Sequence, residues 1–461
     1  MAIRDWTQFH ENPAAITWWC KALGRGLVWL TPPGRRRVLL ALAALLVGIV
    51  TTANTMQRYR YEALPLPSTG FGTALVVLAQ FALLWLVYRA ATRFAALPGL
   101  VRRHPQLALH GSYLGVLAVL WLAGPSSGLW RAVLLGLALV YPMLLWRCGY
   151  LLLAGQHGRM AGTGVTDHLF YLWPAYGGSD TPYGKGLAYL SQNEAKTTQE
   201  LARSQLAGIK LLLLAVLWRL VLSLYEAVVY GPGNRLTDAL GGQTFALPRM
   251  ASLITLGARA PAAQAWASIY GELFEQVLRL AIKGHLIVGF LRLYGLNVFR
   301  NTYKPLLAES IVEFWNRYFY YFKELLSTFF FMPVFTGFGK RLRRWPDLRL
   351  FAAVFAAAFI GNVYYHVIKE SAAMAQGQPL QVLGAHRSRM FYCFLLAIGI
   401  LASMLREQRR RGRSLAAGAV PRGLRIFGVW TFFGLIFVWN ADGGAPFLTR
   451  VGFFLGLFGL A

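Results

Sequence analysis

Long apolar runs separated by short basic loops dominate the hydropathy pattern of the 461-residue chain. A hydrocarbon core about 30 Å thick needs roughly 20 residues of helix, so runs of this length predict membrane-spanning helices. A last apolar run at 446–461 fits either a thin span or an interfacial helix. The other spans are expected at about 38–54, 71–88, 107–123, 129–153, 208–230, 276–296, 350–368, 388–404 and 424–440. The pattern predicts an all-α, polytopic membrane protein with about 9–11 transmembrane helices.

Residues 1–34 do not follow this pattern. Tryptophans such as Trp18 and Trp29 alternate there with the cations Lys21 and Arg25. Aromatic rings at headgroup depth and cations facing phosphate are typical of an interfacial helix. We therefore expect an interfacial amphipathic segment at 1–34, followed by a single integral membrane domain at 35–461.

Two further stretches, at 155–206 and 297–345, are too polar to cross lipid as simple spans. The first is rich in glycine, and the second is aromatic but carries several charged side chains. Irregular or polar backbone at membrane depth is tolerated where it is buried in protein or lines a wet cavity. These stretches predict re-entrant or interfacial helices.

The composition narrows the function classes. Hydrophobic residues make up 56% of the chain and charged residues only 14%, with a mean hydropathy of +0.46. A soluble domain carries about 25% charged residues, so this composition excludes an ordinary cytosolic enzyme and a disordered tail. The net charge of +28 would favour a nucleic-acid partner in a soluble protein. Here the cations sit in short loops, so we expect no nucleic acid and attribute the charge to the positive-inside rule.

The distribution of these cations predicts an orientation. With alternating spans, the basic groups fall on one side of the membrane, whereas the loops at 55–70, 124–128 and 369–387 carry far fewer cations. This asymmetry favours a cytoplasmic N-terminus. The basic groups are Arg35–Arg37, Arg89 to Arg103, Arg147 with Arg159, Lys340 to Arg344, and Arg406 to Arg413.

The span at 350–368 carries the strongest chemical signal. Asn362, His366 and Glu370 are spaced i, i+4, i+8, so they are expected on one helix face. A polar stripe at the end of an apolar span faces protein or water, because facing lipid would be costly. Histidine titrates in the range that general acid–base catalysis needs. A packed histidine hydrogen-bonded to a neighbouring helix is the alternative.

The other candidates carry weaker signals. Glu275 and Arg279 are most simply an ion pair at a helix start, and we expect Glu313 to pair with Arg317 at the same i, i+4 spacing. Arg317 could equally bind a phosphate or pantetheine group. No His/Cys cluster has zinc spacing, so no metal is expected. His285 is isolated on its helix and favours a structural role.

The segment within 297–345 resembles the signature region of membrane-bound O-acyltransferases, in particular the bacterial alginate O-acetylation and teichoic acid D-alanylation membrane proteins. An aromatic-proline run at 171–182 and His366, at the end of an apolar helix, stand in further positions of that family's pattern. The resemblance covers roughly residues 160–370. The signature positions are occupied by Asn301, Tyr303, Pro305, Ser310, Ile311, Glu313, Phe314, Trp315, Arg317, Tyr318, Met332 and Pro333. Phe319 replaces a second histidine of bacterial relatives, and Tyr365 and Val367 replace the Trp and Gly that flank the downstream histidine.

The resemblance implies O-acyl transfer inside the membrane, as in polysaccharide modification. His366 would be the general base, and Asn362 or Asn316 would orient a reactant. The residues implied to bind substrate are Trp315, Arg317, Tyr318, Phe319 and Tyr365.

The implied donor is an acyl thioester, on coenzyme A or an acyl carrier protein, with no tightly bound cofactor. The acceptor would be a hydroxyl of an extracytoplasmic glycan or lipid. The resemblance also implies membrane lipids and the acyl carrier as partners, with a partner protein as a further possibility. It implies a multi-pass location in a bacterial inner membrane.

Two other functions remain open at this point. A transporter or flippase would use the same cavity without chemistry, but no convincing internal repeat supports an inverted-repeat transporter. A catalytically inactive family member acting as a scaffold is favoured by Phe319 and opposed by the polar stripe that contains His366.

Overall fold

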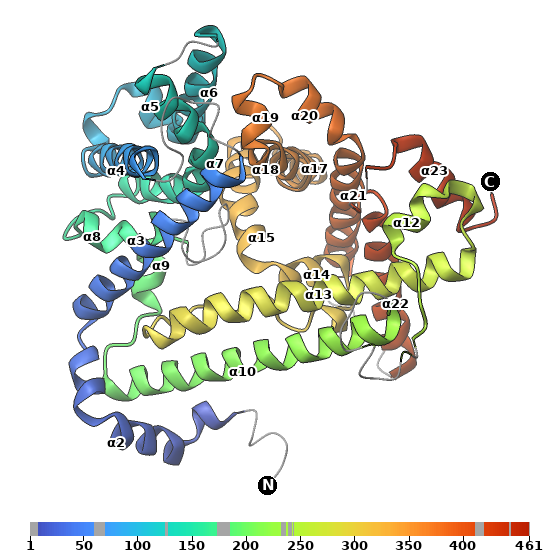
Figure 1. Ribbon diagram of the computed structural model, residues 1–461, viewed down its shortest axis with the longest axis horizontal. Coiled ribbons are helices and arrows are strands. Elements are labelled where there is room, and N and C mark those ends of the chain that lie inside the picture. The colour runs from blue at the N-terminus through green and yellow to red at the C-terminus, as the bar shows by residue number, and fades with distance from the viewer. Residues whose placement is uncertain are drawn as a thin grey trace. The chain divides into compact units, whose positions relative to one another are not determined.

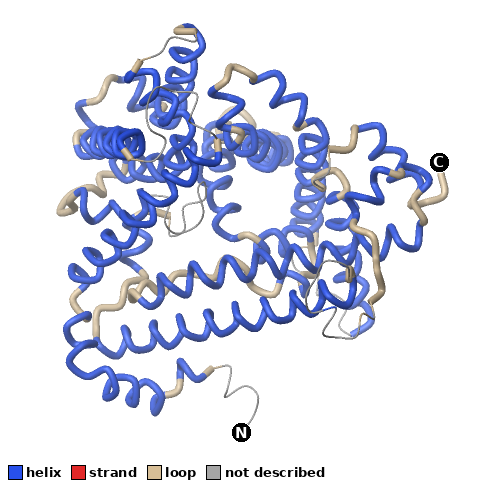
Figure 2. The backbone as a smooth tube through the Cα atoms, in the orientation of Figure 1, coloured by secondary structure: helices blue, strands red, loops and turns tan. Residues whose placement is uncertain are grey.

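The computed structural model describes residues 8–59, 70–124, 128–172, 185–231, 237, 242, 244–410, 419–441 and 444–460. Within these ranges the regular structure is helical, as Figure 2 shows. An isolated antiparallel β-bridge joins Glu194 and Leu296. The prediction of an all-α fold is confirmed for this part of the chain.

Eight helices of the described chain are long and apolar enough to cross a membrane. Each coincides with a predicted span, which is consistent with a multi-pass membrane protein. They are α3 (Pro33–Arg58), α4 (Phe71–Thr92), α6 (Pro105–Leu122), α7 (Leu129–Gln156), α10 (Thr198–Val229), the run Pro346–Lys369, α21 (Arg387–Arg409) and Val420–Phe437 within α22 (Ala419–Phe437).

Two predicted apolar segments are absent from these eight. The span expected at 276–296 lies in α13 (Ala262–Leu293), a long helix that carries several charged residues. The run at 446–461 forms α23 (Phe447–Gly456), which has 10 residues. A helix of that length rises about 15 Å, half of a hydrocarbon core, so α23 by itself is too short to span.

The chain divides into two compact units, each assembled from separate stretches of sequence. The first unit comprises Met1–Leu211, Ile287–Phe299 and His366–Leu383. The second unit comprises Leu212–Leu286, Arg300–Tyr365 and Gly384–Ala461.

The first unit is built around α7, the most deeply buried of its long helices. Helices α4 and α6 pack against α7, and α3 packs against α4 and α8, as their labels in Figure 1 help to follow. The short helix α19 contacts α6 and α7. The remaining short elements of this unit are η1 (Phe9–Glu11), η3 (Phe94–Ala96), α5 (Gly99–Arg103), α8 (Val165–Leu172), α9 (Leu187–Gln192) and α19 (Ser371–Ala375), with α20 (Pro379–Ala385) at the unit boundary.

The N-terminal segment forms the helix α2 (Pro13–Leu30), which begins at a cap where Asn12 Oδ1 accepts from the Ala14 N–H. Gly24 has φ +41°, a left-handed value that favours glycine, and it kinks the helix. Trp19 donates its indole N–H to Gln205 Oε1 at 2.8 Å. Buried side chains of α2, including Leu27, pack against the first turns of α10. The segment is therefore docked on protein along one face, while Trp18 is exposed.

In the second unit, the aromatic segment that contains α14, α15, η6 and α16 packs against α17, α21 and α22. At its other side, α23 packs on α12 and η4, and Trp266 of α13 donates to the Leu457 carbonyl at 3.1 Å. The shorter elements are α12 (Met250–Thr255), η4 (Gly257–Arg259), η5 (Pro305–Leu307), α14 (Ile311–Tyr318), α15 (Tyr320–Leu326), η6 (Ser327–Phe331), α16 (Met332–Gly337), α17 (Pro346–Val354), η7 (Phe355–Gly361) and α18 (Asn362–Lys369, whose last residues, from His366, belong to the first unit).

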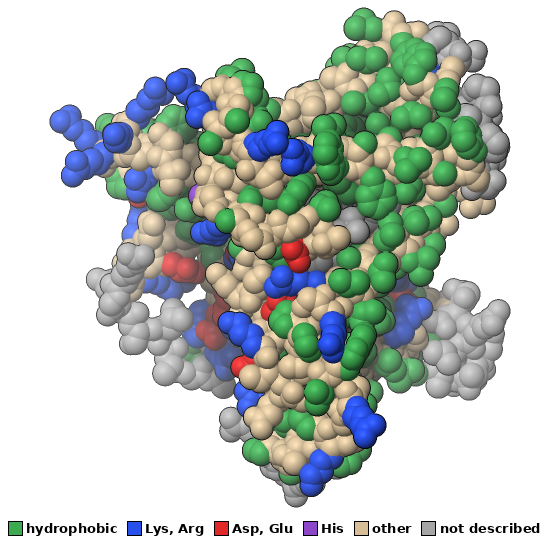
Figure 3. Space-filling view, turned by 90° about the vertical axis from the view of Figure 1, so that its left-hand side faces the viewer, with side chains coloured by type: hydrophobic (Ala, Val, Ile, Leu, Met, Phe, Trp, Pro, Cys, Tyr) green, Lys and Arg blue, Asp and Glu red, His purple; other side chains and the backbone are tan. Residues whose placement is uncertain are grey.

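Large apolar side chains remain exposed along the candidate spans. Leu46 on α3 and Leu78 on α4 are 65% and 63% exposed, and Leu220 on α10 is also exposed. Figure 3 shows one face on which hydrophobic side chains gather over a broad area. A soluble monomer rarely leaves so much apolar surface open, so this surface fits contact with lipid.

Candidate functional site

The helix predicted at 350–368 is a continuous run from Pro346 to Lys369 with a π-helical middle, η7. A second π-helical segment, η6, lies in the aromatic stretch and packs against η7. π-Helical turns are rare and occur frequently at functional sites. Two such segments in contact therefore mark this part of the second unit as a candidate site.

Gly361 allows the two π-helical segments to approach each other. A Cβ atom at this position would lie 2.6 Å from a ring carbon of Phe330 in η6. The ring of Phe330 also neighbours that of Tyr364, with centroids 6.4 Å apart. A larger residue at 361 would have to push Phe330 away, so glycine sets the spacing of η6 and η7.

A buried amide follows directly after η7. Asn362 is 1% exposed, and its Oδ1 has no hydrogen-bond partner among the described residues. Buried polar atoms are nearly always hydrogen-bonded, so an unfilled acceptor within an apolar helix needs a ligand or a water to complete it. Asn362 thus faces protein rather than lipid, as the sequence predicted.

His366 lies one turn further along α18 and is half-buried. The predicted third member of the face, Glu370, lies outside this helix, because α18 ends at Lys369. Glu370 has ψ +48° and is exposed. Asn362 and His366 therefore share one helix, and Glu370 is the first residue after it.

The aromatic segment begins with a capped helix, α14. Ser310 Oγ accepts from the Glu313 N–H at 3.1 Å, and Glu313 Oε2 accepts from the Glu309 N–H at 2.6 Å. This reciprocal arrangement resembles a capping box and fixes the start of the helix. Glu313 also forms the predicted ion pair with Arg317.

Three of the residues predicted to bind substrate meet around one ring. The Phe322 centroid lies 6.1 Å from that of Trp315, 5.4 Å from Phe319 and 4.5 Å from Tyr365. Trp315, Phe322 and Tyr365 are buried, and Phe319 is half-buried. We call Trp315, Phe319, Phe322 and Tyr365 the Phe322 cluster; it packs the aromatic segment against α18.

The other predicted site residues lie elsewhere. Asn316 is exposed on α14, whereas Asn362 is buried. Tyr318, at the end of α14, lines a separate pocket. The two helices α14 and α15 are separated by a break at Phe319, where the Tyr320 N–H donates to the Asn301 carbonyl at 2.9 Å. The aromatic stretch is therefore not one continuous helix.

That pocket is a cavity of about 610 Å³ within the second unit. Its volume lies in the range of small-molecule sites, about 300–1,000 Å³. Residues of α13 form one wall, and the others come from the start of α21, the end of α14, the stretch after α22 and the stretch before α12. The charged and polar lining residues are Arg249, Glu272, Glu275, Gln276, Arg279, Lys283, Tyr318, Arg389 and Asn440.

An ion-pair network organises the pocket wall. The buried carboxylate of Glu275 accepts from Arg249 and, at 2.7 Å, from Arg279, which also pairs with Glu226. The Arg249 guanidinium lies over the Tyr230 ring, 3.5 Å from its centroid. Burial alone would lower the pKa of Arg249, but Glu275 and the other acidic neighbours raise it above its usual value. The predicted Glu275–Arg279 pair is confirmed, although it lies inside α13 rather than at its start.

Sequence reasoning found only this ion pair and missed the pocket. A signal was present: Glu272, Glu275, Arg279 and Lys283 recur at helical spacing, so they form a polar stripe along α13. The opposite wall could not be anticipated, because Arg389 comes from a distant part of the chain.

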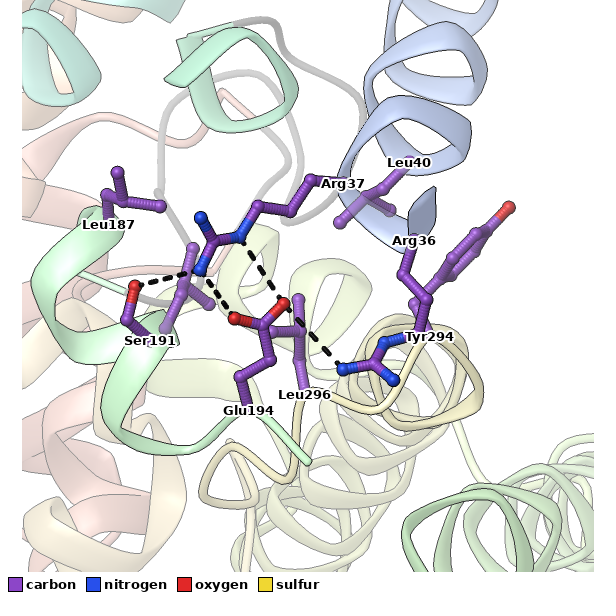
Figure 4. Close-up of a pocket in the computed structure, with 9 residues that line it drawn as sticks. Arg36, Arg37, Leu40, Leu187, Ser191, Glu194, Tyr294 and Leu296 are labelled. Carbon is purple, nitrogen blue, oxygen red and sulfur yellow. Dashed lines mark hydrogen bonds and ion pairs between the residues drawn. The ribbon is translucent and has the colours of Figure 1, made fainter. Parts of the chain in front are cut away.

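A second charged cluster lies in the first unit and has a different character (Figure 4). Arg37 pairs with Glu194 at 2.6 Å and with Asp167 at 3.6 Å. Arg36 is 2% exposed and donates to the carbonyls of Leu30, Thr31 and Ala195. The space left among these side chains is only about 10 Å³, so this cluster has no room for a ligand larger than about one water molecule.

Arg35–Arg37 were expected in a loop, but all three lie in the first turns of α3; Arg35 is exposed, whereas Arg36 is buried. Arg147 is likewise 1% exposed inside α7 and donates to the Met143 carbonyl at 2.8 Å. Neither buried arginine can face phospholipid headgroups, because its side chain is enclosed by protein.

Two other histidines are buried and hydrogen-bonded close to their own position in the chain. His285 is buried, and its Nδ1 is hydrogen-bonded to the Ala281 carbonyl, as a structural role predicts. His168 is 1% exposed and lies 3.0 Å from Thr163 Oγ1 through Nε2. Burial lowers the pKa of His168 to about 4, with a smaller opposing effect of Asp167.

The aromatic-proline run at 171–182 lies almost entirely outside the described residues. In comparisons with known proteins, no family model matches the chain, and no curated protein matches it.

Proposed function

We propose that the protein is a membrane-bound O-acyltransferase that moves an acyl group from a thioester to a hydroxyl of a glycan or lipid. The observation that carries the proposal is the buried, unfilled Oδ1 of Asn362. It lies directly after a π-helical turn and one helical turn before His366. The resemblance of residues 297–345 to that family supplies the reaction class.

In the proposed reaction, His366 removes the proton from the acceptor hydroxyl as its oxygen attacks the thioester carbonyl. The C–O bond of the ester forms and the C–S bond breaks. The thiolate of the donor leaves, and the proton held by His366 passes to it. Asn362 Oδ1 accepts a hydrogen bond from a neighbouring polar group of the acceptor and so orients it. General-base help of this kind is worth about 10²–10⁴ in rate.

The Phe322 cluster supports a place for the acyl group. Its aromatic rings provide an apolar wall beside α18. An acyl chain, delivered as a thioester of coenzyme A or of an acyl carrier protein, would bury its carbon atoms against these rings.

We also propose that the N-terminus is cytoplasmic in a bacterial inner membrane. The eight candidate spans alone would put Lys340 and Arg410 on the side opposite the N-terminus. If α13 also crosses, both fall on the cytoplasmic side, as the positive-inside rule requires. Its stripe of charged residues lines a pocket in protein, which makes a crossing feasible. Labelling of single cysteines at 340 and 410 checks this: reaction from the outside would contradict it.

The test of catalysis compares ester-linked acyl content of surface glycans and lipids in a deletion strain restored with variants at matched protein level. Wild type should restore acylation, and His366→Ala should reduce it by at least about a hundredfold. His157→Ala, which removes an exposed histidine, is the control and should restore it fully. Asn362→Leu should lower acylation as well. Full acylation with a folded His366→Ala protein would refute the assignment.

A catalytically inactive scaffold is the second candidate, and one observation favours it. Phe319 packs on Phe322 in place of a second histidine, so this position offers no titratable group. A scaffold predicts that deletion abolishes acylation by a partner enzyme while His366→Ala restores it.

A further inference from the structure

The geometry points to a second binding site in the 610 Å³ pocket of the second unit, one that takes a phosphate-bearing ligand. The inference does not depend on the proposed acyl transfer, because the pocket is defined by its own residues. Its ligand is either the headgroup of an anionic phospholipid or a small soluble phosphate ester.

The charge of the lining carries this inference. Four cations line the pocket against two carboxylates, Glu272 and Glu275. Glu275 is already shared by Arg249 and Arg279, and Glu272 Oε1 accepts from the Met250 N–H at 2.7 Å. Both carboxylates are therefore bonded to residues of the pocket wall, and the pocket lining has an excess of positive charge.

Lys283 supplies the clearest free cation. It lines the pocket, is exposed, and forms no ion pair with any residue that the structure describes. From the opposite wall, Arg389 is oriented by Asn440, whose Oδ1 accepts from its Nε at 2.9 Å. An ammonium and a positioned guanidinium are the groups that bind phosphate in proteins.

The position of the pocket favours an amphipathic or extracytoplasmic ligand. Arg389 lies at the start of α21, and Asn440 follows the end of α22. Both belong to the ends of these spans that are remote from the basic residues Arg406 to Arg410. The pocket therefore lies toward the membrane face opposite that basic cluster.

The experiment measures binding to the full-length protein carrying single substitutions. One arm uses phosphatidylcholine nanodiscs containing fluorescent phosphatidylglycerol, and the other uses glycerol 1-phosphate in neutral detergent. Lys283→Gln should weaken binding about fivefold, the value of one exposed charge-assisted contact. Lys283→Arg should preserve binding. Lys340→Gln, which removes an exposed lysine of the same unit outside the pocket, is the matched control.

Weakening in the lipid arm alone supports a headgroup site, and weakening in the soluble arm supports a phosphate-ester site. Rising salt should reduce binding in either arm. Equal binding by Lys283→Gln and Lys340→Gln, or absence of saturable binding in both arms, would overturn the inference. Because Lys283 forms no ion pair with the residues that the structure describes, its substitution should leave the fold intact, and thermal unfolding verifies this.

Discussion

The two charged clusters of the protein are made of the same residue types but differ in what satisfies them. In the first unit, the Arg36 guanidinium donates hydrogen bonds to the backbone carbonyls of Leu30, Thr31 and Ala195. A space of only about 10 Å³ remains beside it. In the second unit, Arg249 and Arg279 share Glu275, and about 610 Å³ stays open. An arginine cluster whose guanidinium is surrounded by backbone carbonyls holds loops together, and we call the Arg36 cluster the clamp. An arginine cluster that lines a cavity is instead a candidate ligand site.

The backbone explains this difference. The Ala195 N–H donates to the Gly295 carbonyl at 2.8 Å, which joins two loops around Arg36. Gly295 has φ +83°, and a Cβ there would lie 3.1 Å from Arg36 Nε. The pocket of the second unit is lined mainly by helix α13, with further residues from α14, α21 and the stretches beside α12 and α22. Loops that close over a guanidinium remove the space that a ligand would need.

The largest effect is expected for Arg36→Ala. The substitution leaves the buried Ala195 carbonyl and two half-buried carbonyls without their donor and removes a cation beside Glu194, which should cost about 3–5 kcal/mol of unfolding free energy. Thermal unfolding of the detergent-solubilised protein measures it. Arg35→Ala is the matched control, because Arg35 is exposed and its side chain donates to the Trp29 carbonyl and lies over the Trp29 ring; its effect should stay below about 1 kcal/mol. Similar losses for both variants would contradict the clamp.

A smaller loss of stability is expected at acidic pH. It comes from His168, which lies beside the cluster that contains Arg37. The pKa of His168 is lowered by burial to about 4 from 6.5, so the unfolded state binds more protons between these values. Stability is therefore fully present above pH 6.5, falls as the pH drops toward 4, and levels off below. The loss should reach about 3 kcal/mol. The charged groups that face His168 are Asp167 and Arg37, which lie 3.6 Å apart.

Unfolding measured between pH 7 and 4 tests this expectation. His168→Gln should flatten the profile, because it removes the group that must remain neutral when buried. His157→Gln, at an exposed position, should leave the profile unchanged. An unaltered slope in His168→Gln would assign the acid sensitivity to another group.

The sequence predicted much of the fold because membrane spans are a one-dimensional property. Eight of the expected spans coincide with helices, since apolar length alone determines them. The burial of Asn362 also followed from its place in an apolar run.

The charged clusters were harder to predict because their partners are far apart in sequence. Arg36 and Arg37 are adjacent to the basic Arg35, yet their partner Glu194 follows more than 150 residues later. The pocket likewise joins Arg249, Lys283 and Arg389. Charge pattern along the chain identifies cations, but only tertiary structure separates a clamp from a binding site.

The smallest effect on stability among these predictions is expected for Glu275→Gln. This variant tests most directly whether the pocket, unlike the Arg36 cluster, binds a ligand. Glutamine keeps the shape of Glu275, and Arg249 and Arg279 are 40% and 52% exposed, so water can solvate them. The loss should be about 1 kcal/mol. The pocket gains one positive charge, so phosphatidylglycerol or glycerol 1-phosphate should bind about fivefold more tightly.

Glu313→Gln is the control, since it breaks the Glu313–Arg317 pair, which does not line the pocket. It should change stability by a similar amount and leave phosphate binding unchanged. Tighter binding in Glu275→Gln alone requires that the ligand senses the charge inside this cavity. A gain shared by both variants would instead reflect the net charge of the protein, and the distinction between the open pocket and the closed clamp would then lose its functional meaning.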